Sequence, residues 1–320
     1  MKIKNIKQKI KNYNFLCIGA CHKDMIISLK NDIKYFRTNP VESKFELGGV
    51  ASNISHNLSL FSNKVKIFSL KIINNHKKVL KKNKIKFYNI SKNNNDSFYI
   101  AIINKFGKLI AGLASNQDYE KINFINYNII NRNIKKNTFI ILDLCFNKKL
   151  TSKIIKYYYK KGVEIMVSGT SSFKINRIKE SLNMISGLCL NEDEIYMLTK
   201  KKKLKESINF ILNKNKKISL AVTRGNKSVL MVYNGIFYEG IVPKIKVVNE
   251  NGAGDAFTSM FFLSLCAKIN PILTLKLSIA LGCMQVIEYK NKNLLKYDKK
   301  FQHFIDEIKI KKYDSKIHRN

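Results

Sequence analysis

The chain has 320 residues, of which 45% are hydrophobic, and its 59 Lys and Arg against 22 Asp and Glu give a formal net charge of +37. This composition excludes a disordered chain, and the length suits one large domain. No run approaches the roughly 20 apolar residues of a membrane span, and the basic N-terminus lacks the apolar core of a signal peptide. We therefore expect a cytoplasmic protein with no membrane partner.

The positive charge by itself suggests a nucleic-acid-binding protein. The lysines are scattered through the whole chain, as in proteins from genomes rich in A and T, and are not gathered on one periodic face. We therefore expect no specific nucleic-acid partner, although the charge would attract anionic substrates such as nucleotides. The six cysteines lie mostly in apolar runs without the spacing of a zinc site, which predicts buried free thiols.

The N-terminal part predicts a strand and a helix interrupted by hairpins. After a basic lead-in of 13 residues, FLCIGACH (15–22) predicts a buried strand followed by a turn. Residues 25–47 and 96–113 predict short strands outside the main sheet, and the second segment turns at Gly107. Between them, GGVASNISHNLSLF (48–61) predicts a helix that begins at the glycine pair.

Strands and helices alternate over the rest of the chain. The predicted strands are 65–70, 138–144, 163–169, 187–191 and 218–225, and the predicted helices are 148–160, 174–183, 192–213, 255–268 and 271–289. A further hairpin is predicted at 227–242, with Asn234-Gly235 as its turn. This alternation is typical of a mainly parallel sheet with helices on both faces.

The motif Gly252-Ala253-Gly254-Asp255 stands at the start of a predicted helix. Small residues there let backbone N–H groups approach an anion, and the helix N-terminus adds partial positive charge. Asp255 could accept the proton of an attacking hydroxyl, or it could simply favour the helix N-terminus. From this motif alone the two interpretations are equally supported. Neither a Walker A loop nor a complete dinucleotide fingerprint is present.

Two polar residues stand near the other glycine pair. Asp24 follows the first predicted strand, and Asn53 lies on the helix that Gly48 and Gly49 open. Ligands of α/β proteins collect at the carboxyl ends of strands. A carboxylate and an amide suit a pair of sugar hydroxyls, whereas the alternative for each residue is a local turn or cap.

Four motifs, in order along residues 15–290, resemble those of the PfkB-type, ribokinase-like sugar kinases. GGVASNISHNLSLF resembles the first signature of that family and VVNENGAGDAFTSMFF (247–262) the second. NEDE (191–194) resembles the Asn-x-x-Glu motif, and VTRGNKSV (222–229) the strand at the nucleotide site. The resemblance implies one kinase domain over residues 1–320, folded as a ribokinase-like three-layer α/β sandwich with a mainly parallel central sheet. Segments 25–47 and 96–113 would form a small β-sheet lid.

The same resemblance implies an enzyme that transfers a phosphoryl group from ATP to an alcohol, with Mg²⁺ as a cofactor. Asp255 is then the general base, and Gly252, Ala253 and Gly254 supply a backbone anion hole. The implied substrate-binding residues are Asp24, Asn39, Gly48, Gly49 and Asn53. The implied ATP-binding residues are Asn191, Glu194, Thr223, Gly225 and Asn251, with Glu194 holding Mg²⁺ through water.

A finer likeness points to the pseudouridine kinase branch. TNPVESKFELGGVASNISHNL (38–58) is similar to the corresponding stretch of that branch, as are GACHKDM (19–25), SSFKINRI (171–178) and Val248-Asn249. This likeness predicts phosphorylation of the 5′-hydroxyl of pseudouridine. The alternatives are another PfkB-type kinase for ribose, adenosine or a fructose-type sugar, a non-catalytic regulator on the same fold, and a basic nucleic-acid-binding protein. Many relatives pair through the lid, which implies a homodimer.

The chain departs from the family pattern in three places. Asn249-Glu250-Asn251 stands where Asp-Thr-Thr is usual, Ser52 replaces an arginine, and Asn116-Gln117 replaces an acidic residue followed by Met. The first change removes a hydroxyl and adds a negative charge beside the phosphate site, and the second removes a charged contact at the sugar or lid. Because Asp255 and the motif glycines persist, we expect a slower enzyme rather than an inactive one.

Overall fold

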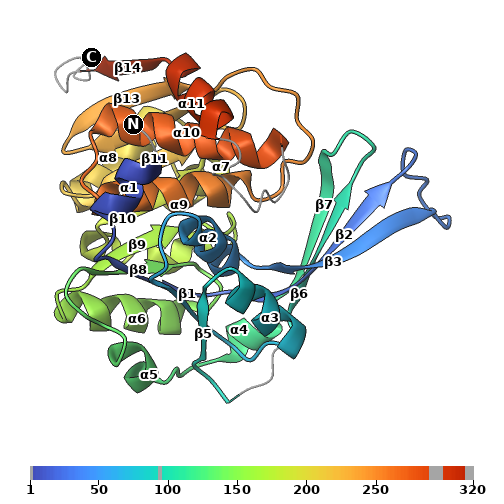
Figure 1. Ribbon diagram of the computed structural model, residues 1–320, viewed down its shortest axis with the longest axis horizontal. Coiled ribbons are helices and arrows are strands. Elements are labelled where there is room, and N and C mark those ends of the chain that lie inside the picture. Colours follow the sequence, from blue (N-terminus) through green and yellow to red (C-terminus); the bar gives the residue numbers. More distant parts are fainter. Residues whose placement is uncertain (1–2, 93–95, 288–297, 314–320) are drawn as a thin grey trace.

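The computed structural model describes residues 3–92, 96–287 and 298–313. Within these residues, ten strands form a large sheet and four strands form a smaller one. Helices cover both faces of the large sheet, and the small sheet projects from the body of the molecule (Figure 1). The predicted three-layer α/β architecture, with a mainly parallel central sheet and a separate small β-sheet, is confirmed.

The large sheet has a parallel part and an antiparallel edge. In spatial order its strands are β14 (Ile310–Tyr313), β13 (Ile236–Ile241), β12 (Ser228–Tyr233), β11 (Ser219–Thr223), β10 (Gly187–Asn191), β9 (Glu164–Ser168), β8 (Thr138–Leu142), β1 (Asn14–Ile18), β4 (Val65–Ser69) and β5 (Lys86–Asn89). Strands β12 to β14 are antiparallel and the others are parallel. Parallel strands covered on both faces need side chains that are apolar on both sides, which is why the central strands β8, β10 and β11 are mostly apolar, whereas the edge strand β5 is partly exposed and carries Lys86.

Two layers of helices bury the faces of the large sheet. One layer consists of α1 (Ile3–Lys9), α2 (Val50–Ser59), α3 (Asn74–Lys82), α9 (Ala253–Cys266), α10 (Pro271–Ile287) and α11 (Asp298–Glu307). The other consists of α4 (Gln117–Lys121), α5 (Tyr127–Asn131), α6 (Lys148–Lys160), η1 (Ile175–Ile178), η2 (Leu182–Met184), α7 (Glu192–Thr199) and α8 (Leu204–Lys214). None of the helices in the described ranges combines the length and the hydrophobicity that spanning a membrane requires.

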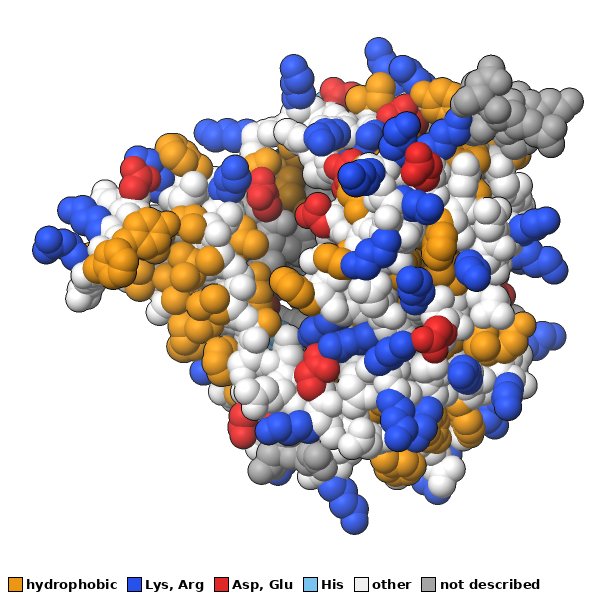
Figure 2. All heavy atoms as spheres, turned by 180° about the vertical axis from the view of Figure 1, so that it is seen from behind, with side chains coloured by type: hydrophobic (Ala, Val, Ile, Leu, Met, Phe, Trp, Pro, Cys, Tyr) orange, Lys and Arg blue, Asp and Glu red, His pale blue; other side chains and the backbone are white. Residues whose placement is uncertain are grey.

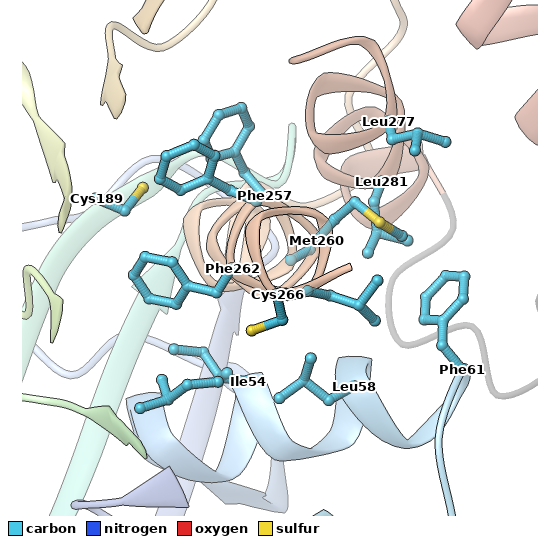
Figure 3. Packing of buried hydrophobic residues seen from close by; sticks show 14 of the residues in the cluster. Ile54, Leu58, Phe61, Cys189, Phe257, Met260, Phe262, Cys266, Leu277 and Leu281 are labelled. Carbon is cyan, nitrogen blue, oxygen red and sulfur yellow. The ribbon is translucent and has the colours of Figure 1, made fainter. Parts of the chain in front are cut away.

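The helix α9 lies at the centre of the first layer. Figure 3 shows its side chains Met260 and Phe262 among residues of α2 and α10, such as Ile54 and Leu281. A helix that is apolar on nearly all sides must be covered on all of them. The first turn of α9 therefore has a fixed position relative to α2.

The small sheet consists of β3 (Val41–Gly48), β2 (His22–Leu29), β6 (Phe98–Ile103) and β7 (Leu109–Ser115), in that spatial order. Its register places Phe45, Met25, Ile100 and Leu113 in one row across the four strands, so these side chains share a face. Asp24 belongs to the neighbouring row and lies on the opposite face. The four strands fall in the two segments predicted for the small β-sheet.

The segment predicted as a helix over 174–183 instead forms the short 3₁₀ turns η1 and η2. The side-chain amide of Asn215 donates hydrogen bonds to the carbonyls of Leu182 (2.9 Å) and Ile185 (2.8 Å). These bonds hold the end of the segment against the C-terminal end of α8.

Both ends of the described chain contain regular structure that no sequence pattern predicted. The basic lead-in contains α1, whose Ile6 is completely buried in the core. Near the C-terminus, β14 pairs with β13. In both places a few apolar side chains hold a lysine-rich segment against the body. The end of the predicted helix 271–289 and the last residues of the chain lie outside the described residues.

The carboxylate of Asp143, directly after β8, connects three segments at the carboxyl edge of the sheet. Its Oδ2 accepts hydrogen bonds from the backbone N–H groups of Ala20 (2.7 Å) and Ala51 (3.0 Å), and its Oδ1 accepts one from Cys145 (2.9 Å). Ala20 lies in the turn between β1 and β2, and Ala51 in the first turn of α2, where a negative charge is favourable. This contact fixes the start of α2 relative to β1 and β8.

Replacing Asp143 with Asn is expected to lower the free energy of unfolding by about 2–3 kcal/mol, because an amide nitrogen cannot accept a bond and leaves a buried N–H unpaired. Urea unfolding followed by circular dichroism measures this change. Asp306→Asn on the exposed side of α11 is the control, with an expected change within about 0.5 kcal/mol. Equal stability of the two variants would contradict the role of Asp143.

Candidate active site

The helix α9 begins at Gly252, which takes a left-handed conformation with a φ of 79°. Ala253, Gly254 and Asp255 form the first turn. Among the described residues, no acceptor binds the backbone N–H groups of Gly254 and Asp255. These N–H groups lie at the positive end of the helix dipole and can bind an anion.

The side chain of Asp255 bonds to a different helix. It makes no capping bond to α9, and its Oδ2 accepts a hydrogen bond of 2.8 Å from Nδ2 of Asn53 on α2, 202 residues earlier in the sequence. The two glycine motifs of the chain thus open helices whose first turns are in contact. Asp255 therefore does more than favour the start of its own helix.

The surroundings of Asp255 make its carboxyl group less acidic. Burial is the main cause that raises its pKa to about 7, and the hydrogen bond from Asn53 opposes this rise. The negative charges of Asp143, Asp24 and Glu194 raise the pKa further. A carboxylate that titrates near neutral pH can accept a proton more readily than an ordinary aspartate.

Asp24 and the glycine pair fit each other closely. Asp24 is only 6% exposed, and a Cβ atom at Gly48 would lie 1.9 Å from its carboxylate carbon. Oδ1 of Asp24 lies 3.0 Å from Nδ1 of His22 on the same strand. Gly49 has a φ of 93°, and a side chain there would meet the carbonyl oxygen of Ala20 at 2.4 Å. Both glycines are therefore required for space, and Gly49 also for its backbone conformation.

A cavity of about 610 Å³ adjoins these residues. It extends from Asn251 and Gly252, past the edge strand β3, to α2 and α3. Much of its wall consists of amide and imidazole side chains: Asn53, His56 and Asn57 of α2, and Asn75, His76 and Asn83 close to or on α3. Burial, followed by the positive charge of Lys23, lowers the pKa of His76, so its imidazole is neutral at pH 7. The cavity therefore offers neutral hydrogen-bonding groups beside the charged side chains of Lys23, Asp24 and Glu46.

The small sheet touches the loop that leads into α9. Gly107, in the turn between β6 and β7, is so close to this loop that a Cβ atom would come within 1.9 Å of the carbonyl oxygen of Val248. On the other side, the N–H groups of Val248 and Asn249 donate to the carbonyl of Val286 on α10 (2.8 and 3.2 Å). Oδ1 of Asn249 accepts from the N–H of Asn251 at 2.8 Å. The loop is thus held between the small sheet and α10.

The residues expected at the nucleotide lie at the carboxyl ends of β10 and β11. Asn191 and Glu194 form a reciprocal capping box at α7, with two bonds of 2.8 Å between side chain and backbone. Burial raises the pKa of Glu194 to about 7, against the effect of the Asn191 N–H. Thr223 bonds weakly to the carbonyl of Leu190 (3.4 Å), and Gly225 is exposed in the turn that follows.

Asn39, expected on the substrate side, does not line the cavity. Its side chain accepts from the N–H of Lys34 and donates to the carbonyls of Lys34 and Arg37, at 2.8 to 2.9 Å. The amide therefore stabilises its own loop. By contrast, Ser52, which stands in place of an arginine, lies on the cavity wall, and Glu250 is exposed.

Sequence reasoning missed two side chains that hold the site together. Asp143 is one, and its only local signal is an acid directly after a buried strand. The other is Tyr119, whose hydroxyl accepts from the N–H of Cys21 (2.9 Å), donates to the carbonyl of the same residue (3.0 Å) and contacts Oγ of Ser69 (3.0 Å). Together they fix the turn that precedes Asp24.

The pfkB family carbohydrate kinase pattern matches the chain over residues 14–291. No curated protein matches it. A solved carbohydrate kinase from Agrobacterium tumefaciens is 18% identical, with 93% of this chain and 100% of that chain covered and a TM-score of 0.73. The ribokinase from Thermotoga maritima is 15% identical, with 92% of this chain and 99% of that chain covered and a TM-score of 0.72. An Arabidopsis thaliana ribokinase complexed with ribose and ATP is also 15% identical, with 92% of this chain and 98% of that chain covered and a TM-score of 0.67. At these identities the solved structures establish a shared, ribokinase-like fold.

The raised pKa of Asp255 predicts a pH-dependent stability. Its unfolded pKa lies near 3.8 and its folded pKa near 7, so the folded state loses stability as pH rises from about 4 to 7. Asp255→Asn removes this loss. The free energy of unfolding of the variant should therefore rise by about 1–2 kcal/mol relative to that of the wild type between pH 4 and pH 8. This is less than the full pKa difference would give, because water screens the partly exposed carboxylate.

Thermal and urea unfolding at both pH values measure this difference. Asp32→Asn, in an exposed loop, is the matched control and should show a difference that does not vary with pH. A constant difference for Asp255→Asn as well would show that its carboxyl group titrates in the usual acidic range.

Proposed function

We propose that this chain, which belongs to the pfkB family of carbohydrate kinases, uses ATP to phosphorylate the 5′-hydroxyl of a ribosyl compound, and that pseudouridine is this compound. The observation that carries the proposal is the hydrogen bond between Asn53 and Asp255. It places the helix expected to bind the sugar against the helix expected to bind the transferred phosphoryl group.

In the proposed reaction, Asp255 accepts the proton of the 5′-hydroxyl. The hydroxyl oxygen forms a bond to the γ-phosphorus of ATP while the bond from that phosphorus to the β-phosphate oxygen breaks, and ADP leaves. The free N–H groups of Gly254 and Asp255 stabilise the negative charge on the phosphoryl group in transfer. Asn53 holds one oxygen of Asp255 and so leaves the other to face the substrate.

Asp24 is suited to bind sugar hydroxyls. Its carboxylate is buried, with Oδ1 paired to Nδ1 of His22 at 3.0 Å, whereas no donor among the described residues bonds to Oδ2. A ligand hydroxyl would supply the donor that Oδ2 lacks. The backbone at Gly48 and Gly49 lies beside it, with no side chain to block the sugar.

The residues at the end of β10 fit an indirect metal site. Mg²⁺, when bound with ATP, would neutralise charge on the phosphates. Glu194 uses Oε2 to accept the Asn191 N–H, so we expect it to hold Mg²⁺ through water rather than directly. Thr223, Gly225 and Asn251 would lie on the nucleotide side of the same edge.

Two observations support pseudouridine over a free sugar. The stretch 38–58 is similar to the pseudouridine kinase branch, and the cavity beyond Asn53 is lined by amides and a neutral imidazole. Such groups can pair with the carbonyl and N–H groups on the edge of a uracil ring, whereas ribose has no ring substituent to fill this space. The rival substrate is ribose, because two of the similar solved structures are ribokinases.

A kinase assay on a panel of acceptors tests the proposal. Purified protein with ATP and Mg²⁺ should convert pseudouridine with a kcat/KM at least tenfold above that for uridine, ribose, adenosine or fructose 6-phosphate, measured by ADP release and by the mass of the product. Its kcat/KM should rise with pH up to about 7 and then level, because Asp255 must be deprotonated to act.

Asp255→Asn should lower kcat by about 10²–10⁴-fold while ATP binding persists, because only the proton acceptor is lost. Preference for ribose would overturn the substrate and leave the kinase mechanism standing. If no acceptor is phosphorylated although ATP binds, the chain is a non-catalytic regulator.

We also propose that the small sheet forms a homodimer. The row of Phe45, Met25, Ile100 and Leu113 leaves Phe45 54% and Leu113 52% exposed, and apolar side chains gather over the projecting sheet (Figure 2). An apolar sheet face of this kind favours a partner. Light scattering should give the mass of two chains for the wild type and of one chain for Leu113→Lys, whereas Lys312→Glu on β14 should stay dimeric. A monomeric wild type would contradict the proposed homodimer.

A further inference from the structure

A second hollow, of about 600 Å³, lies at the opposite end of the large sheet from the candidate active site. It is formed where β1, β4, β5 and β8 begin, whereas the site lies where parallel strands end. Its lining consists of Val65, four asparagines (Asn12, Asn14, Asn63, Asn137) and five lysines (Lys64, Lys66, Lys86, Lys135, Lys136). The lining contains neither an acidic nor an aromatic side chain.

Two of these lysines are direct neighbours across adjacent strands. Lys66 of β4 is in register with Lys86 of β5, on strands about 4.8 Å apart. Two residues further along the same face, Phe68 stacks on Tyr88 with a ring separation of 4.9 Å, which confirms that the pairs of side chains lie side by side. Like charges in such a position repel each other and destabilise the sheet.

The other lysines add to this repulsion. Lys66 is partly buried, and burial, then the charges of Lys135, Lys86 and Lys64, lower its pKa. No carboxylate of the described chain forms an ion pair with any lysine of the hollow. Elsewhere on the surface some lysines do have such partners, as Lys148 has in Glu180 (2.6 Å).

Lysine is abundant over the whole visible surface (Figure 2), so a count alone would not mark a site. The hollow differs in its arrangement, because five lysines from three separate segments line one concave space without a carboxylate partner among the described residues. Amide side chains beside them can donate further hydrogen bonds. The volume is in the range of small-molecule sites, about 300–1,000 Å³.

We infer that this hollow binds a compact, multiply charged phosphate compound of the di- or triphosphate class, at a site separate from the candidate active site. Phosphoryl oxygens accept bonds from ammonium and amide groups and carry the charge needed to offset five lysines. A single-stranded nucleic acid fits less well, because no aromatic side chain lines the hollow for bases to stack on. The bound anion would relieve the repulsion between Lys66 and Lys86 and so stabilise the fold.

Isothermal titration with inorganic tripolyphosphate, without Mg²⁺, tests this inference. At 50 mM NaCl we expect the wild type to bind one tripolyphosphate per chain. The variant Lys66→Gln/Lys86→Gln should bind tripolyphosphate with an affinity at least tenfold lower. Binding should weaken several-fold at 200 mM NaCl, because salt screens the ammonium charges. Lys201→Gln/Lys202→Gln, which removes the same charge from an exposed loop, should bind as the wild type does.

Thermal unfolding shows whether a loss of binding in the double variant comes from a loss of folded protein. Without tripolyphosphate, Lys66→Gln/Lys86→Gln should unfold at or above the unfolding temperature of the wild type, since the repulsion between the two lysines is gone. Adding tripolyphosphate should raise the unfolding temperature of the wild type more than that of this variant. Lys135→Gln/Lys136→Gln, in the turn before β8, should reproduce the loss of binding. Unchanged binding in both double variants, or an equal loss in the control, would overturn the inference. Turnover of ATP should be the same in all of them.

Discussion

The carboxylate of Asp143 accepts backbone N–H groups from three segments that are far apart in the sequence, and the carboxyl edge of the sheet is arranged around it. It binds the turn before β2, which carries Asp24, and the first turn of α2, which carries Asn53. A buried carboxylate is stable only when its oxygens are fully bonded, so these segments have little freedom to move apart. The positions of Asp24 and Asn53 depend on this interaction, and that of Asp24 also on the bonds of Tyr119.

The distribution of charge is uneven despite the net charge of +37. Most lysines are exposed, and at physiological ionic strength salt screens their fields over about 8–10 Å. The carboxylates at the site are partly or fully buried, where charges interact more strongly. This is why the neighbouring acids contribute to the raised pKa of Asp255 although the protein as a whole is strongly basic.

The loop before α9 shows how the chain tolerates its departures from the family pattern. Asn249 bonds through its side chain to the N–H of Asn251, which gives the loop a local turn. Glu250 is exposed between them. Contact with Gly107 of the small sheet and with Val286 of α10 holds the same loop from both sides. The shape of the loop before α9 therefore depends on the Asn249 side chain and on backbone contacts with the small sheet and α10.

Much of the fold follows from local chemistry, and the sequence by itself determined it. Apolar runs separated by helical patterns predict a parallel sheet, and Asn234-Gly235 predicts a hairpin because both residues take positive φ, 50° and 76°. The glycines at 49 and 252 likewise mark helix starts that need unusual backbone angles. In each case the cause acts within a few residues.

The tertiary structure alone decided which of these residues meet. Short 3₁₀ turns form in place of a predicted helix, the amide of Asn39 bonds within its own loop, and β14 joins the sheet edge. Above all, Asn53 and Asp255 are in contact across 202 residues of sequence. Such pairs depend on strand order and on how helices pack against a shared core, and neither is encoded in the spacing of nearby residues.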